Sequence, residues 1–477
     1  MKAFMDQDYL LTTETARRLY HEYAQGEPIV DYHSHLSARD IAEDRHYRDL
    51  YEAMVEPNPF KARLMRAAGV EEKYITGGRT DAFTRFQKFA EVIPQAAGNP
   101  IYAWTHMELS SFFGITEPLT PDTAPEVWDK ANRRLAEKDF GICGLLGQIG
   151  VKLICTTEDA AADLKYYKRI SEAGLPFRTV PALRLDKVLR IEDPQWENYM
   201  KYELGEAAGV EEAHTMQDVR AMLRQRVSDF DALGCRTADH VLDYVFFAPA
   251  EEFELDDIVG RIINGRGEPS RKEAEQYKTA VLMTLAKEYA KRDWVMQLRF
   301  AAIRGANVAM TGKFGDDAGF DCIGDYDCAV ALSGFLNALS ERISLPRMIV
   351  YSANPADQPV IASVLGAFQD TATDRVRGIP GKLQLGTACW FNMSRRALDH
   401  QIEAVANFAV LGTAVGMLAD AHTPFSLVRH DYYRRILCRY LGKLVEYGEY
   451  PGDDGALGSL VRNICWRNAE QYFGFRI

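Results

Sequence analysis

Short apolar runs rich in β-branched residues alternate along the chain with longer segments whose apolar residues recur at helical spacing. This alternation is typical of βα units that build a parallel sheet. The runs that we expect to be strands are residues 28–33, 151–157, 176–183, 237–245, 294–300, 346–352, 382–391 and 414–420. Eight such strands predict an α/β protein with a (β/α)₈ TIM-type barrel. No run is followed by a GxGxxG turn, which disfavours an open dinucleotide-binding sheet.

The spacing of the predicted strands is uneven at the start of the chain. A long interval with helical patterns separates the first run from the second. We therefore predict an N-terminal helix and the first barrel strand in residues 1–35, a helical insertion in 36–150 and the remainder of the barrel in 151–477. Barrels of this kind carry their active sites on the loops at the carboxyl ends of the strands, so chemistry is expected there.

The stretch VDYHSHL places two histidines, His33 and His35, at the end of the first predicted strand. Side chains alternate along a strand, so the two imidazoles point the same way. Two convergent imidazoles suit a borderline divalent metal, with zinc expected first and manganese as the alternative. A turn whose histidines face solvent explains the pair equally well on these residues alone.

Asp420 and His422 follow the last predicted strand. In a closed barrel that strand lies beside the first, so Asp420 could complete a metal site with His33 and His35, and His422 could add a fourth ligand. The alternative is that Asp420 caps the next helix. We favour the metal site because such sites recruit ligands from several barrel strands.

Arginines also lie at or just after predicted strand ends, at Arg184, Arg299 and Arg304. A guanidinium in a barrel mouth suits a bidentate grip on a carboxylate, which predicts an acidic substrate. Pairing with loop acids at the surface is the alternative for each. Trp390 and Asn392 could offer a stacking surface and an amide to a sugar-like ligand, although core packing explains the aromatic residue as well.

Two further segments carry polar groups near predicted strand ends. Asp239 and His240 could include a general base, whereas a hydrogen-bonded core position explains His240 equally well. The segment GDDAGFDCIGD, residues 315–325, is rich in aspartate but lacks the spacing of an EF-hand, so we expect a loop over the barrel mouth.

Composition narrows the class of protein. The 477 residues carry a formal net charge of −12, which weighs against nucleic-acid binding. No apolar run is long enough to span a membrane, and the acids in the first 24 residues indicate a helix rather than a signal peptide. Eight scattered cysteines without a CxxC pair predict reduced thiols and a cytoplasmic protein.

Ten distinctive sequence motifs are distributed along nearly the whole chain. They are FMDQDYLL, PIVDYHSHLSARDIAED, RLMRAAGVEEKYITG, WTHMEL, ICTTEDAAADL, GCRTADH, GFDCIGD, GKLQLGTACWFN, RHDYYRRILC and NICWRNAEQYF. With these motifs the chain resembles the uronate isomerase (glucuronate isomerase) family of the amidohydrolase superfamily. The resemblance implies a (β/α)₈ barrel with a helical insertion. It also implies aldose–ketose interconversion of glucuronate with fructuronate and of galacturonate with tagaturonate.

The resemblance also implies roles for single residues. His33 and His35 match the family's metal ligands on the first strand, and Asp420 matches its ligand on the last strand, which is also proposed to transfer protons. Arg184 matches an arginine that holds the substrate. The implied partner is a small sugar acid, and a barrel of this size is compatible with a homo-oligomer.

Two positions at strand ends depart from the family pattern in a complementary way. Arg299 stands where the family usually has histidine, and Asp420-Ala421-His422 stands where it usually has Asp-Ser-Arg. One histidine has become arginine and one arginine has become histidine. We interpret this as a compensated exchange, in which His422 returns an imidazole to the metal or to acid–base work and Arg299 returns a guanidinium to the substrate anion.

A third departure bears on the reaction itself. Pro59-Phe60 stands where the family usually has a His-Tyr pair, whose tyrosine is thought to transfer protons. Phenylalanine has no ionisable group. The alternative function is therefore a metal-dependent hydrolase, lyase or epimerase of a sugar acid or lactone on the same barrel. A metal-free binding protein would leave the His-His-Asp set without a role.

Overall fold

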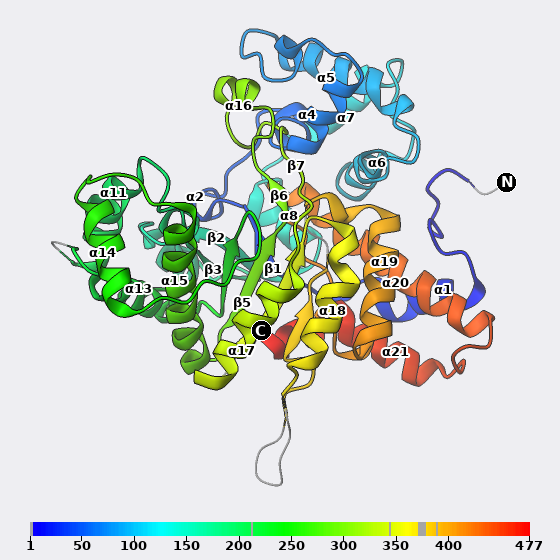
Figure 1. Cartoon of the computed structure of the whole chain (residues 1–477). Helices are drawn as coiled ribbons and strands as arrows, with labels where there is room; N and C mark the ends of the chain where they lie inside the picture. The colour runs from blue at the N-terminus through cyan, green and yellow to red at the C-terminus, as the bar shows by residue number, and fades with distance from the viewer. Residues whose placement is uncertain (1–2, 211–212, 343–344, 371–377, 388–389) are drawn as a thin grey trace.

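A curled parallel sheet forms the centre of the computed structural model, which describes residues 3–210, 213–342, 345–370, 378–387 and 390–477 (Figure 1). Its strand order is β1-β2-β3-β4-β5-β8-β9, and every pair is parallel. The strands are β1 (Ile29–Ser34), β2 (Val151–Asp159), β3 (Arg178–Arg184), β4 (Thr237–Val241), β5 (Val295–Phe300), β8 (Arg347–Ser352) and β9 (Leu383–Leu385). A small antiparallel ladder joins β6 (Ala302–Ile303) to β7 (Cys322–Ile323).

Most of the predicted strands are confirmed. All six residues of β1 and all six of β5 are buried, as expected for parallel strands that are covered on both faces. The predicted run 237–245 ends early, at Val241, and the run 382–391 shrinks to Leu383–Leu385. Ala388 and Cys389 of that run lie outside the described residues.

The eighth predicted strand, 414–420, is the exception. It makes one parallel bridge to β1, between Ser34 and Ala421, instead of a ladder. Side chains of β1 take over the pairing: the Tyr32 hydroxyl donates to Gly416 O at 2.9 Å, and Ala419 N donates to an Asp31 carboxylate oxygen at 3.1 Å. The backbone at Asp420 has a φ of 49°, which is incompatible with a continuing strand. The sheet is therefore curled but open at this edge, not the closed eight-stranded barrel that the pattern predicts.

The interval between β1 and β2 is helical. It holds α2 (Ala38–Ala42), α3 (Leu50–Met54), α4 (Pro59–Ala67), α5 (Ala82–Val92), α6 (Pro100–Phe113), α7 (Ala124–Leu135) and α8 (Ile142–Gln148). Helices α4 to α7 gather beyond one end of the sheet, beside the β6–β7 ladder (Figure 1). Their apolar side chains share one core with those of α20 (Val428–Glu446), so this segment packs on the C-terminal part of the chain.

The other α-helices lie around the sheet or at its margins, except α16, which lies beside α4 (Figure 1). They are α1 (Glu14–Leu19), α9 (Lys165–Glu172), α10 (Asp186–Leu189), α11 (Trp196–Asn198), α12 (Gly205–Ala208), α13 (Met216–Ala232), α14 (Glu252–Ile263), α15 (Arg271–Arg292), α16 (Val308–Phe314), α17 (Ala329–Arg342), α18 (Gln358–Ala367), α19 (Arg395–Phe408), α21 (Asp454–Arg462) and α22 (Asn468–Phe473). None of the helices in the described ranges is long and apolar enough to cross a membrane.

Candidate active site

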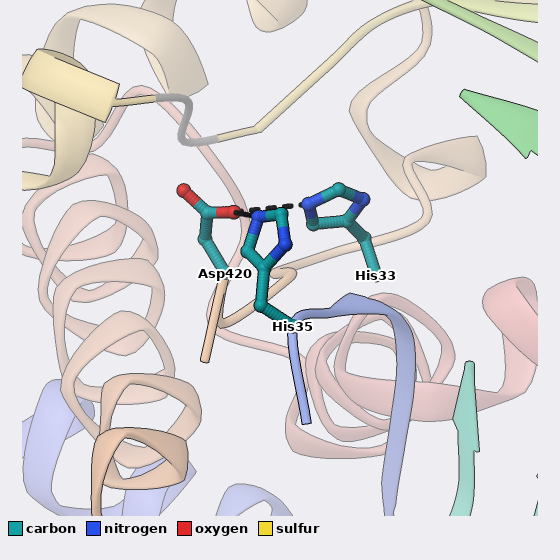
Figure 2. Close-up of side chains that lie close together, drawn as sticks. All are labelled: His33, His35 and Asp420. Atoms are coloured by element: carbon teal, nitrogen blue, oxygen red, sulfur yellow. Dashed lines mark hydrogen bonds and ion pairs between the residues drawn. The ribbon is translucent and has the colours of Figure 1, made fainter. Parts of the chain in front are cut away.

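Three predicted metal ligands meet at the carboxyl end of β1. His33 lies in β1, His35 follows it directly, and Asp420 approaches from the neighbouring segment (Figure 2). One Asp420 carboxylate oxygen lies 2.9 Å from His33 Nε2 and 3.2 Å from His35 Nε2. Within the described residues, the ligand atoms of these three side chains all lie within 4.8 Å of one another. Two imidazole nitrogens and a carboxylate oxygen form a donor set that fits zinc or a similar divalent ion.

Local backbone geometry aims these groups at one point. Ser34 separates the two histidines, so strand alternation turns both imidazoles to the same side. His35 N donates to Ala421 O at 2.8 Å, which ties the end of β1 to the residue after Asp420. Asp420 itself has left-handed backbone dihedrals, which are uncommon outside glycine and are often found at functional sites.

A buried carboxylate lies behind His33. Asp239 Oδ2 lies 2.7 Å from His33 Nδ1 and 2.7 Å from Arg299 Nε. Burial alone would raise the pKa of Asp239, but the Arg299 and His33 charges hold that pKa well below its usual range. Because its oxygen lies within ion-pair distance of the far nitrogen of a candidate ligand, Asp239 can orient His33. Its neighbour His240 points away and stacks on Tyr289, as the core alternative predicts.

His422 joins the site without joining the ligand cluster. Its ring stacks on that of His35, with centroids 4.8 Å apart and planes 21° from parallel. In the described structure the ligand cluster comprises His33, His35 and Asp420 only, so the expected fourth ligand is not found there. Burial, together with the His35 charge, lowers the pKa of His422 to about 4. The imidazole is therefore neutral at pH 7 and can accept a proton.

A cavity of about 400 Å³ opens over these groups, which is in the range of small-ligand pockets. It is lined by His33, His35, Pro59, Phe60, Thr157, Asp159, Arg184, Asp186, Lys187, Arg190, Val241, Arg299, Arg304, Asp316, Asp317, Gly319, Asp321, Trp390, Asp420 and His422. Four of these belong to the segment 315–325, which confirms the predicted loop over the mouth. The lining includes six carboxylates and five arginine or lysine side chains, so charges of both signs face the cavity.

The predicted arginines have carboxylate partners in the cavity wall. Arg184 forms an ion pair with Asp186. Arg304 Nη2 lies 2.9 Å from an Asp317 oxygen, and its guanidinium lies 5.2 Å from the ring centroid of Trp390. An incoming sugar carboxylate would share these guanidinium groups with the resident acids or displace them.

Asn392 is the predicted site residue that the structure does not bring to the cavity. Its amide nitrogen donates to Ser352 O at 2.8 Å, and the side chain is buried. A buried amide needs hydrogen-bond partners, and this one finds them at the end of β8. The bond connects the segment after Trp390 to that strand.

Sequence reasoning missed other cavity residues, among them Asp159 and Lys187. Asp159 ends β2 and is the register partner of Arg184, so its position at a strand end was an available signal. Lys187 lies in the short helix that follows β3, where no pattern distinguishes it from a solvated lysine.

Comparison with known proteins gives a consistent result. The profile of the glucuronate isomerase family matches residues 1–473. The uronate isomerase of Lachnospira eligens is 40% identical over 476 residues, covering 100% of both chains. That of Caldanaerobacter subterraneus subsp. tengcongensis is 39% identical over 475 residues, covering 99% of this chain and 100% of its own.

Solved structures agree with this similarity. A uronate isomerase from Thermotoga maritima superposes with a TM-score of 0.91 at 27% identity, over 99% of this chain and 100% of its own. A glucuronate isomerase from Caulobacter crescentus shares the fold, with a TM-score of 0.90 at 21% identity over 99% of this chain and 97% of its own.

Proposed function

The chain belongs to the glucuronate isomerase family, and from this premise we propose how its cavity performs the uronate isomerase reaction. The reaction interconverts the aldose and ketose forms of a sugar acid, with glucuronate and galacturonate as the proposed aldoses. The observation that carries the proposal is the convergence of His33, His35 and Asp420 inside one cavity at the end of a parallel strand. Uronate isomerases match the chain over its full length, which supports the same activity.

We propose that His33, His35 and Asp420 hold a divalent metal, zinc first and manganese as the alternative. A bound ion would supply positive charge beside the oxygen atoms on which charge develops during isomerisation. Asp239 lies 2.7 Å from His33 Nδ1 and helps to hold the ring with Nε2 toward the ligand point.

Isomerisation requires a base to remove a proton from the carbon next to the carbonyl and an acid to return it. Burial would raise the pKa of Asp420, but its hydrogen bonds with His33 and His35, followed by their charges, hold that pKa well below the usual range, so the carboxylate is ionised. We assign proton transfer to Asp420 and to the neutral imidazole of His422. Phe60 lines the same cavity but has no proton to transfer, and Asp420 and His422 lie at the candidate metal site.

We assign the substrate carboxylate to Arg184 and Arg304, whose guanidinium groups face the cavity from different walls. The ring of Trp390 contacts the Arg304 guanidinium and helps to hold it in place. Arg299 also lines the cavity, yet its Nε bonds Asp239, so its proposed share is charge rather than a free bidentate grip.

We further propose that the curled sheet represents a (β/α)₈ barrel whose last strand is held by side chains, with residues 36–150 inserted after the first strand. Helix α4 of this segment supplies Pro59 and Phe60 to the cavity wall. The described cysteines are free, in keeping with the predicted cytoplasmic location. Self-association stays a prediction.

The direct test is proton NMR of the zinc- or manganese-loaded protein with D-glucuronate and with D-galacturonate in D₂O. We expect ketose signals, and deuterium at C2 in the reverse reaction. Unchanged substrate from protein that contains its metal would overturn the isomerase and favour the second candidate, a hydrolase, lyase or epimerase of a sugar acid or lactone. Phe60 in the cavity is the observation that favours this second candidate.

Replacing His422 by alanine should lower kcat about 10²- to 10⁴-fold, because a positioned acid–base group contributes that much. Metal content should stay at the parent value, since His422 lies outside the ligand cluster of the described residues. The control is His21→Ala, which removes a partly exposed imidazole paired with Asp8. A His422→Ala enzyme with parental kcat would remove this residue from the proposed proton route.

A further inference from the structure

A buried arginine contacts the backbone of the proposed metal ligand. Arg429 is the second residue of α20, and only 2% of its surface is exposed. Its Nη1 donates to Ala419 O at 2.7 Å and to Asp420 O at 3.4 Å. Because Arg429 contacts main-chain carbonyls, it holds the backbone conformation at these residues. The Asp420 carboxylate contacts His33 and His35 instead.

This position is costly for a cation. The amino-terminal end of a helix carries partial positive charge, which disfavours an arginine there. Burial also lowers the pKa of Arg429, although the nearby Glu108 charge opposes the change. A buried charge is stable only where neighbouring groups compensate it. The contacts of Arg429 therefore indicate its structural role.

Part of the compensation comes from the helical segment between β1 and β2, and the charges of Asp420 and Asp31 add to it. Trp104 of α6 presents its ring face to the guanidinium, with the centroid 4.5 Å from Cζ. Glu108, one turn further along α6, forms a buried ion pair with Lys61 of α4 at 2.5 Å. The aromatic face of Trp104 and the Glu108 carboxylate, both from α6, thus help to compensate the Arg429 charge, and Glu108 also pairs with Lys61.

The backbone that Arg429 contacts is strained. Asp420 has a φ of 49°, a backbone conformation that is strained for a residue other than glycine. The preceding residue is held from two sides, with Ala419 N bound to Asp31 and Ala419 O bound to Arg429. These two bonds hold the peptide units on both sides of Ala419, the second of which leads into Asp420.

We infer that Arg429 is a positioning residue, which holds Ala419 and Asp420 in the conformation that aims the Asp420 carboxylate at His33 and His35. Trp104 braces Arg429 and thereby links the helical segment 36–150 to the affinity of the site. The inference rests on the proposed metal site.

The test compares Arg429→Met and Arg429→Lys with the parent full-length protein. Zn²⁺ affinity is measured by competition with a chelator, and the absorption spectrum of bound Co²⁺ reports ligand geometry without any turnover. We expect Arg429→Met to bind Zn²⁺ about 10- to 100-fold more weakly, as groups that orient metal ligands typically contribute that much. We expect Arg429→Lys to recover part of this loss and both variants to show an altered Co²⁺ spectrum.

Arg434→Met is the matched control. Arg434 lies on the same helix, is also buried and donates to the backbone carbonyls of Glu27 and Pro28, each at 2.8 Å. Its loss should lower the Tm of the metal-free protein and leave the Zn²⁺ affinity at the parent value. This separates positioning from general destabilisation.

Parental Zn²⁺ affinity and an unchanged Co²⁺ spectrum in folded Arg429→Met would overturn the positioning role but not the proposed metal site. If that variant does not fold, Trp104→Leu takes its place, with a smaller loss of affinity expected and parental affinity again overturning it. A parent protein that binds no stoichiometric Zn²⁺ would overturn the proposed metal site, and the positioning role with it.

Discussion

Replacing Asp420 by asparagine is expected to remove both metal binding and isomerase activity. The Asp420 carboxylate is the only negative charge among the three converging side chains, and both imidazoles approach the same oxygen, at 2.9 and 3.2 Å. Asparagine keeps the shape but removes the charge that attracts a divalent ion. Loss of a direct ligand should exceed the effect of losing an outer one, so we expect Zn²⁺ affinity to fall by more than about 100-fold.

Activity should fall further than metal loss alone explains, because Asp420 is also assigned to proton transfer. Supplying saturating Zn²⁺ to Asp420→Asn should therefore restore metal content but not kcat. Metal content by atomic emission and turnover by NMR separate the two effects. The control is Asp163→Asn, an exposed aspartate paired with Lys165, which should keep both properties. Full activity in metal-saturated Asp420→Asn would refute its role in proton transfer.

Strand positions and the first half of the site were predictable from the sequence, since both depend on local pattern. Short runs rich in apolar residues locate β1, β5 and β8, because parallel strands are buried on both faces. The His33–His35 pair follows from strand alternation. The segment 414–420 was predicted as a strand because its apolar residues suit burial, which the hydrophobic pattern detects regardless of whether the backbone pairs in a ladder.

Long-range pairings were beyond sequence reasoning. Asp239 and Arg299 were both noticed at strand ends, but only the β4–β5 register, which sets Val241 opposite Arg299, shows that they lie close together. The sequence assigned Arg299 to the substrate, whereas burial obliges it to pair with Asp239 first. Asn392 was misjudged for a related reason, since its amide satisfies backbone carbonyls of a strand end far away in the chain.

The ion pair between Arg299 and Asp239 makes Arg299→Met the substitution with the largest expected effect on stability. Asp239 is fully buried and Arg299 is 4% exposed, so methionine would leave a carboxylate with one of its two charged partners removed. Breaking a buried ion pair by removing one partner costs about 3–5 kcal/mol. We expect this loss in the free energy of unfolding of the metal-free protein, measured by urea denaturation.

The double variant Arg299→Met/Asp239→Asn tests the cause, because it also removes the charge that the single variant leaves behind. It should recover part of the lost stability, and the recovered part measures the cost of leaving Asp239 unpaired. Arg271→Met is the surface control, since Arg271 pairs with Glu275 in solvent and should change stability little. If Arg299→Met proved as stable as the parent, the pairing with Asp239 would not be the main role of Arg299, and its proposed exchange with His422 would again assign it to the substrate anion. A large loss instead means that this arginine mainly holds Asp239, and through it His33, which favours Arg184 and Arg304 as the groups that bind the substrate anion.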